Sequence, residues 1–159
     1  MRAIHAAAVA AALAVTSCAT LAEDPARLPA DTPASYRSEC GGCHAAFPPG
    51  LLAADGWRDV MAGLSAHFGD NAAIPDAQRR ELEDFLVRHA GEPRRFGSRR
   101  EPARLTATTW FRRTHGTVRR TFGDPRVGSA ANCGACHTEA EAGGFRPVSP
   151  LARELARQP

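Results

Sequence analysis

Two short segments of the sequence repeat one spacing of cysteine and histidine. Residues 40–44 read CGGCH and residues 133–137 read CGACH. C-x-x-C-H is the attachment pattern of c-type haem, in which each thiol adds to one vinyl group of the porphyrin and the adjacent histidine faces the iron. The pattern predicts two covalently bound haem c groups, with thioether bonds and proximal iron ligands from Cys40, Cys43, His44, Cys133, Cys136 and His137.

Other uses of paired cysteines fit the sequence less well. A thioredoxin-like pair needs a strand–helix context and has no use for the following histidine. A structural zinc site needs four ligands, which two pairs about ninety residues apart can supply, but both histidines are then surplus. Disulfides suit an exported chain, yet a two-residue spacer makes a strained, reducible bridge. Two copies of the full pattern therefore favour haem.

Three histidines are candidates for the second axial ligand of each iron. His67 follows His44 by 23 residues, and His115 precedes His137 by 22 residues. The similar separations predict the pairs His44/His67 and His115/His137. The competing interpretation of each histidine is a packed or solvated side chain, and His89, on an apolar stripe, is the reserve candidate.

Met61 is the alternative soft ligand. It is the one methionine left after Met1, so at most one haem has Met/His ligation. If residues 55–68 form one straight helix, His67 is rotated about 120° from Met61, and the two cannot easily serve one iron. We expect Met61 to fill the core.

The elements that position these residues are expected to be short helices. Helical spacing of apolar residues places Trp57, Met61, Leu64 and Phe68 on one face, and Leu82, Phe85, Leu86 and His89 on another. Asp76 is the expected N-cap of the second of these helices. No alternating pattern is long enough for a sheet. The expected class is all-α, small helices and loops wrapped around two covalently bound c-type haems, with helices over residues 35–43, 55–68, from 76, 106–118 and 151–157.

The beginning of the chain has the layout of a secretory signal peptide. A positive start is followed by an apolar run and small residues before a cut at residue 22. Cys18 lies in a rival bacterial lipobox, in which it becomes the acylated first residue. We expect a periplasmic protein, with lipid anchoring at Cys18 possible, divided into a signal peptide (1–22), a cytochrome c-like N-terminal haem c domain (23–92) and a C-terminal haem c domain (93–159).

Composition narrows the function further. The 159 residues include 43% hydrophobic but only 6% aromatic residues, so an ordinary core is thin, and the length excludes a large multidomain enzyme. Residues 94–126 hold ten arginines against two acids. This segment lacks interleaved aromatics and belongs to an exported chain, so we expect no nucleic acid partner. A solvated basic face is one interpretation, and arginines that grip haem propionates or steer acidic partners are another.

Longer motifs around both haem patterns carry a family resemblance. They are CGGCHAAFPPGLL at 40–52, Trp57, the stretch from Met61 that includes HFGDNA at 67–72, TWFRRTH at 109–115 and NCGACH at 132–137. Over about Ser35 to Pro150 the chain resembles the dihaem cytochrome c family called DHC of purple and related bacteria.

The resemblance implies two bis-histidine haems of low potential and an electron-transfer role rather than an enzyme. It gives His67 and His115 the distal-ligand role and leaves no family role for His89. It also implies redox partners, an oxygen-binding Sphaeroides haem protein and a membrane b-type cytochrome, with no small-molecule substrate. The alternative function is a small dihaem enzyme or reductase subunit with one open haem that reduces peroxide, nitrite or oxygen.

Overall fold

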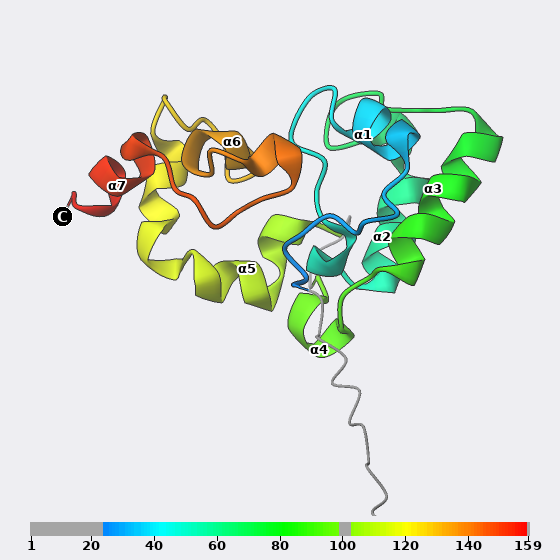
Figure 1. Cartoon of the computed structure of the whole chain (residues 1–159), viewed down its shortest axis with the longest axis horizontal. Helices are drawn as coiled ribbons and strands as arrows, with labels where there is room; N and C mark the ends of the chain where they lie inside the picture. Colours follow the sequence, from blue (N-terminus) through cyan, green and yellow to red (C-terminus); the bar gives the residue numbers. More distant parts are fainter. Residues whose placement is uncertain (1–23, 99–102, 159) are drawn as a thin grey trace, which may run out of the picture.

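Short helices arranged in two lobes make up the molecule (Figure 1). The structure is a computed structural model that describes residues 24–98 and 103–158; the expected signal peptide and lipobox cysteine lie outside them. Within the described residues there is no strand, and extended pairing is limited to isolated bridges such as Ala53 with Gly91. The predicted all-α class is therefore confirmed.

The helices α1 to α3 form one lobe, α5 to α7 form the other, and α4 lies below the junction (Figure 1). None of the helices in the described residues is long and apolar enough to cross a membrane. The α-helices are α1 (Ala34–Cys40), α2 (Ala54–Ala62), α3 (Asp76–Arg88), α4 (Pro93–Phe96), α5 (Thr109–Thr114), α6 (Cys133–Cys136) and α7 (Pro150–Ala156). The 3-10 helices are η1 (Pro49–Leu51), η2 (Leu64–Ala66), η3 (Leu105–Ala107), η4 (Gly116–Gly123) and η5 (Ala140–Ala142).

The core of the first lobe lies where α2 packs against α3. Its buried side chains include Met61, as the sequence predicted, and the stripe of α3; they are Tyr36, Ala46, Leu52, Trp57, Met61, Leu82, Phe85 and Leu86. Two polar groups in this core are satisfied by carbonyls that precede α2. The hydroxyl of Tyr36 donates to the carbonyl of Phe47 at 2.6 Å, and the indole of Trp57 donates to the carbonyl of Pro49 at 2.7 Å.

A second, smaller core connects the lobes. It consists of Leu51, Phe96, Leu105 and Phe111, so one residue of the first half packs among residues of the second. Here the chain passes close to itself: a Cβ added at Gly91 would meet the ring of Phe96 at 2.6 Å. Only glycine allows this approach.

The expected helix over residues 55–68 is wrong in its second half. Helix α2 ends at Ala62, and Gly63 donates its N–H to the carbonyls of Asp59 and Val60. Glycine is a poor helix former, so the α-helix ends here and the chain continues as the 3-10 helix η2. His67 follows η2 and therefore does not lie on α2. Phe68 is consequently 39% exposed rather than part of the apolar face.

Other helix ends also differ from expectation. Asp76 is the first residue of α3 rather than its N-cap, and the preceding Pro75 makes no side-chain cap. The expected helix at 106–118 is interrupted because Thr108 caps α5, its hydroxyl accepting from the N–H of Phe111 at 3.1 Å. The short helices expected at 35–43 and 151–157 are confirmed within three residues at each end as α1 and α7.

The Tyr36 hydrogen bond anchors the segment that follows the first haem motif. We predict that Tyr36→Phe lowers the free energy of unfolding by about 1–3 kcal/mol, because the carbonyl of Phe47 loses its donor. Urea unfolding of the haem-loaded protein measures this loss. The control is Gln78→Ala, which removes an exposed hydrogen bond between α3 and Glu39 and is expected to change stability by less than about 0.5 kcal/mol. Equal stability of the two variants would contradict the role of Tyr36.

Candidate haem sites

The first site brings together His44, from the loop after α1, and His67, the residue that ends η2. Their ring centroids are 6.3 Å apart and their planes differ by 24°. Both residues are half-buried. The turn at His67 is closed by a hydrogen bond from the N–H of Asp70 to its carbonyl at 3.0 Å. The fold therefore brings together the two histidines that the spacing pairs, and their role as ligands stays a prediction.

The second site brings together His115, which ends α5, and His137, which follows α6. Their ring centroids are 6.1 Å apart and their planes differ by 88°. Both are half-buried and lie in the second lobe. The fold thus places each predicted distal histidine opposite its predicted proximal partner.

The separation of the rings fits one metal ion in each pair. An imidazole nitrogen binds a first-row transition metal at ~2.0 Å and lies ~1.1 Å from the centre of its own ring, so two imidazoles on opposite sides of one metal have centroids about 6.2 Å apart. The two observed separations, 6.3 and 6.1 Å, bracket this value. Other ring contacts include 4.6 Å, for His44 on Phe47, and 6.3 Å, for Trp110 with His115, so the spacing fits a shared metal but also occurs between rings that share none.

Each site has one imidazole fixed by a hydrogen bond to the backbone. Nδ1 of His44 donates to the carbonyl of Ala45 at 2.8 Å, and Nδ1 of His115 donates to the carbonyl of Phe111 at 3.1 Å. A carbonyl only accepts, so Nδ1 carries the proton and Nε2 is left free as a ligand atom. Nδ1 of His137, by contrast, is buried and has no hydrogen-bond partner. Every other buried side-chain nitrogen or oxygen in the described residues has one.

Burial lowers the pKa of three of these histidines, His67, His115 and His137, below the usual value. The partner imidazole lowers it further in two cases, His44 acting on His67 and His115 acting on His137. All three are therefore neutral at neutral pH, which is the form of histidine that binds metals.

The cysteines are placed for covalent attachment rather than for pairing. All four in the described residues are free. Cys40 packs against the first core, whereas Cys133 lies in the second lobe, so the two pairs do not face one common zinc ion. Burial raises the pKa of Cys40 and of Cys133 to about 11, so both are neutral thiols at neutral pH. A thioether has no proton to lose and tolerates this burial.

A cavity of about 870 Å³ opens beside the second pair. This volume lies within the roughly 300–1,000 Å³ of sites that hold small molecules and cofactors. Its wall combines both halves of the chain and includes Cys133, Cys136, His115, His137, Phe47 and Trp110. The residues present therefore fit a haem that is attached through residues 133–137.

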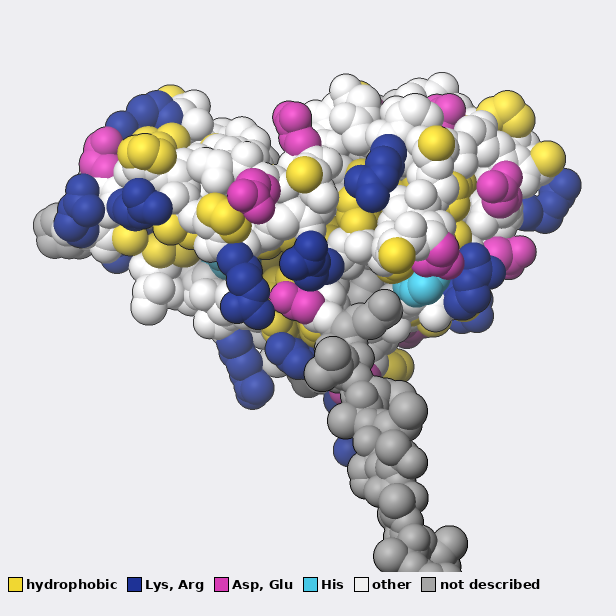
Figure 2. Space-filling model, in the orientation of Figure 1, with side chains coloured by type: hydrophobic (Ala, Val, Ile, Leu, Met, Phe, Trp, Pro, Cys, Tyr) yellow, Lys and Arg dark blue, Asp and Glu magenta, His cyan; other side chains and the backbone are white. Residues whose placement is uncertain are grey.

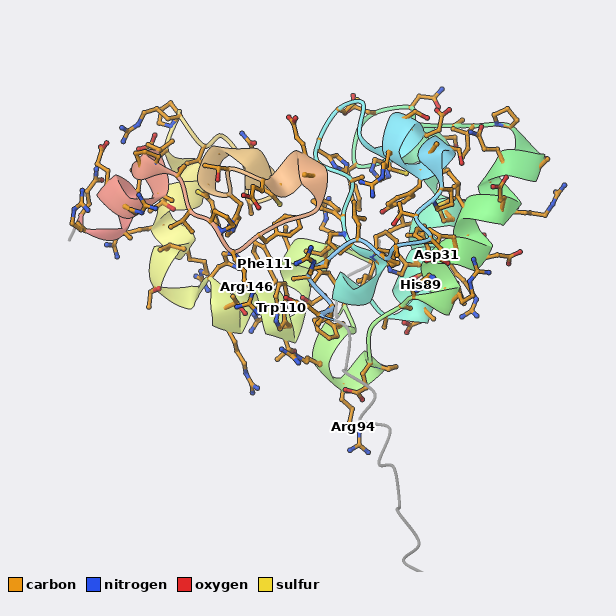
Figure 3. The ribbon with its side chains drawn as sticks, in the orientation of Figure 1. Asp31, His89, Arg94, Trp110, Phe111 and Arg146 are labelled. Carbon is orange, nitrogen blue, oxygen red and sulfur yellow. The ribbon has the colours of Figure 1, made fainter. Side chains whose placement is uncertain are left out.

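The reserve candidate His89 lies elsewhere. It ends α3, packs its ring on Phe85, and its Nε2 lies 3.0 Å from a carboxylate oxygen of Asp31 (Figure 3). The structure therefore places His89 at neither site.

Sequence reasoning missed the aromatic residues that support the ligands. Phe111 stacks on His115 at 4.2 Å, and Phe47 stacks on His44 at 4.6 Å. The spacing of Phe111 four residues before His115 on a helix was the available signal. Phe47 lies in a loop, and no periodic pattern in the sequence predicts its contact with His44.

Two C-x-x-C-H motifs, each with a histidine pair at the spacing of one metal, define a c-type cytochrome with two haems. The family model of dihaem cytochrome c, DHC, matches residues 36–145. The chain belongs to this family, whose members carry two covalently bound c-type haems. Membership implies a role in electron transfer.

Solved structures of the family resemble the chain over 85–99% of their own length. The diheme cytochrome c of Shewanella baltica OS155 is 39% identical, with 70% of this chain and 85% of that chain covered and a TM-score of 0.60. A diheme cytochrome c from Rhodobacter sphaeroides is 36% identical, with 75% and 99% covered and a TM-score of 0.62. DHC purified from Rhodobacter sphaeroides is 38% identical, with 72% and 97% covered and a TM-score of 0.57. No curated protein matches the chain.

Each cysteine pair is expected to attach one haem, so removal of one pair should remove one haem and leave the other bound. We predict that Cys133→Ala with Cys136→Ala reduces the mass of the protein by one haem while the other haem stays bound. The matching change of Cys40 and Cys43 removes the other haem. Mass spectrometry after acid denaturation, with haem-attachment machinery co-expressed, measures both. Retention of two covalent haems by either double variant would refute the assignment.

Proposed function

We propose that the chain is a periplasmic electron carrier in which His44 and His67 close one haem iron and His115 and His137 close the other. The distance between the ring centroids in each pair, 6.3 and 6.1 Å, is the observation that carries this proposal. The cysteines at 40, 43, 133 and 136 hold the porphyrins. We propose an electron carrier rather than an enzyme, because imidazoles on both sides of each iron would leave no open position for a substrate.

The bound haems supply one-electron oxidation and reduction. The side chains and backbone of the protein keep the proposed iron ligands in place during electron transfer. The carbonyls of Ala45 and Phe111 orient one imidazole at each site, and the stacked rings of Phe47 and Phe111 prevent it from swinging. Fixed ligands change little between oxidation states, which favours fast transfer and excludes small molecules from the metal.

Redox proteins are the proposed partners, namely a Sphaeroides haem protein-like cytochrome and a membrane b-type cytochrome, with electrons passing from the membrane to the haem protein. Exposed arginines support docking to an acidic surface, and those on α5 and η4 are Arg112, Arg113, Arg119 and Arg120. Figure 2 shows arginine side chains on both lobes, with acidic side chains among them. No nucleic acid partner is proposed.

The proposed organisation keeps two haem domains, residues 23–92 and 93–159. The larger core lies within the first lobe, which supports the division, while the smaller core, which includes Leu51 of the first half, joins the two halves. Residues 1–22 are the proposed export signal.

Removal of a distal ligand is expected to open one iron. We predict that His67→Ala and His115→Ala each convert one of the two haems to high-spin iron that binds carbon monoxide when reduced, whereas the parent protein binds none. Optical spectra of the ferric and the carbon monoxide-treated ferrous proteins measure this. His89→Ala is the matched control, since its imidazole pairs with Asp31, and both of its haems should stay closed. Carbon monoxide binding by the parent protein would instead support an enzyme with an open haem.

Export is tested separately from ligation. We expect the haem-loaded protein in the periplasmic fraction, with a mature chain that begins at residue 23. The measurement is osmotic-shock fractionation followed by intact mass. A diacylglycerol adduct on Cys18, abolished in Cys18→Ala, would show anchoring by a lipid instead of release by signal cleavage.

A further inference from the structure

The two histidine pairs differ in one respect that their equal spacing conceals. The imidazole planes of His44 and His67 are 24° apart, close to parallel, whereas those of His115 and His137 are 88° apart, close to perpendicular. Free rotation about the Cβ–Cγ bond permits either arrangement, so the surrounding protein must select it.

Phe111 holds the ring of His115 at two points. Its carbonyl accepts from Nδ1 of His115 at 3.1 Å and also from the backbone N–H of the same residue at 2.9 Å. Its own ring lies against the imidazole at 4.2 Å, with the planes 24° apart. The hydrogen bond fixes the position of the nitrogen, and the stacked ring fixes the plane.

Phe111 is itself well fixed. Its side chain is 6% exposed in the second core, and its N–H donates to the hydroxyl of Thr108 at the start of α5. Figure 3 shows Phe111 and Trp110 together at α5, along the lower edge of the second lobe. The other neighbours of His115 do not lie parallel to its ring: Trp110 meets it at 80° and Phe122 at 52°.

His137 is held in a different way. Its Nδ1 makes no hydrogen bond, and Phe145 meets its ring edge-on at 5.6 Å. Burial lowers the pKa of His137, and backbone hydrogen bonding with Phe145 and Pro147 raises it by less. No ring of the described residues stacks parallel on His137, whereas Phe111 stacks on His115, so the plane of His115 is the one that an aromatic neighbour fixes.

We propose that Phe111 is a positioning residue that holds His115 perpendicular to His137, so that the second haem differs electronically from the first. This rests on the proposed function, in which these histidines are the axial ligands. Parallel imidazoles donate π electrons into the same iron d orbital and separate it in energy from its neighbour. Perpendicular imidazoles donate equally into two d orbitals and leave them nearly degenerate.

The electron paramagnetic resonance spectrum of ferric iron reports this difference. Separated d orbitals give a rhombic low-spin spectrum with three resolved features. Nearly degenerate orbitals give a highly anisotropic low-spin spectrum dominated by a single low-field line. We expect the haem-loaded protein, frozen in the ferric state, to show one signal of each kind, each integrating to one iron per chain. Two rhombic signals, or two highly anisotropic ones, would overturn the proposal.

Phe111→Leu tests the positioning residue itself. The variant keeps the backbone carbonyl but removes the stacked ring, so His115 gains freedom to rotate. We expect the low-field line to shift towards the rhombic range or to broaden, while the rhombic signal of the first haem stays unchanged as an internal control. Phe122→Leu is the matched control, because Phe122 neighbours the same imidazole without lying parallel to it, and its spectrum should match the parent. An unshifted low-field line in Phe111→Leu would overturn the role of Phe111.

The two proposals fail in different ways. High-spin iron in the parent protein would end the proposed ligation, whereas two low-spin signals of the same type would end only the inference about Phe111. If Phe111→Leu loses the second haem, Phe111→Met fills a similar volume without a flat ring and replaces it in the same comparison. The spectrum of the parent protein tests the perpendicular arrangement without any variant.

Discussion

In the proposed ligation an iron atom sets the distance between the two imidazoles that bind it, and the fold has to hold that distance twice within a small chain. The two pairs of imidazoles have ring centroids 6.3 and 6.1 Å apart, close to the separation that one shared metal requires. This requirement explains why the helices are short and why the histidines lie at their ends. His67 ends η2 and His115 ends α5, positions where the backbone leaves the helix axis and a side chain can face another element.

The two haem groups were predictable from the sequence because haem attachment depends on a short local pattern of residues. Attachment needs two thiols and a histidine within five consecutive residues, and this survives in any fold. The similar separations of 23 and 22 residues within the histidine pairs are a less local signal, yet the paired histidines are neighbours in the structure. The all-α class and the burial of Met61 also followed from spacing, since apolar periodicity reports which face of a helix is buried.

Tertiary contacts decided what the sequence could not show. The prediction of one helix through residue 68 failed at Gly63, where the local preference for ending a helix outweighed the apolar pattern that continues to Phe68. Phe68 instead has a positive φ and an exposed side chain. The guanidinium carbon of Arg104 lies 4.1 Å from the centroid of its ring. The pairing of Phe68 with Arg104 joins residues distant in sequence, and no periodicity within either segment signals it.

Phe47 shows how closely the two sites depend on each other. Its ring stacks on His44, its side chain lines the cavity beside His137, and its carbonyl is tied to Tyr36 in the first core. One residue thus contacts a ligand of the first site and the wall of the second. Electron transfer between two centres weakens steeply with the gap between them, and packed atoms carry it better than empty space. The contacts of Phe47 therefore join the two sites, and the boundary proposed at residues 92 and 93 divides the sequence without separating them.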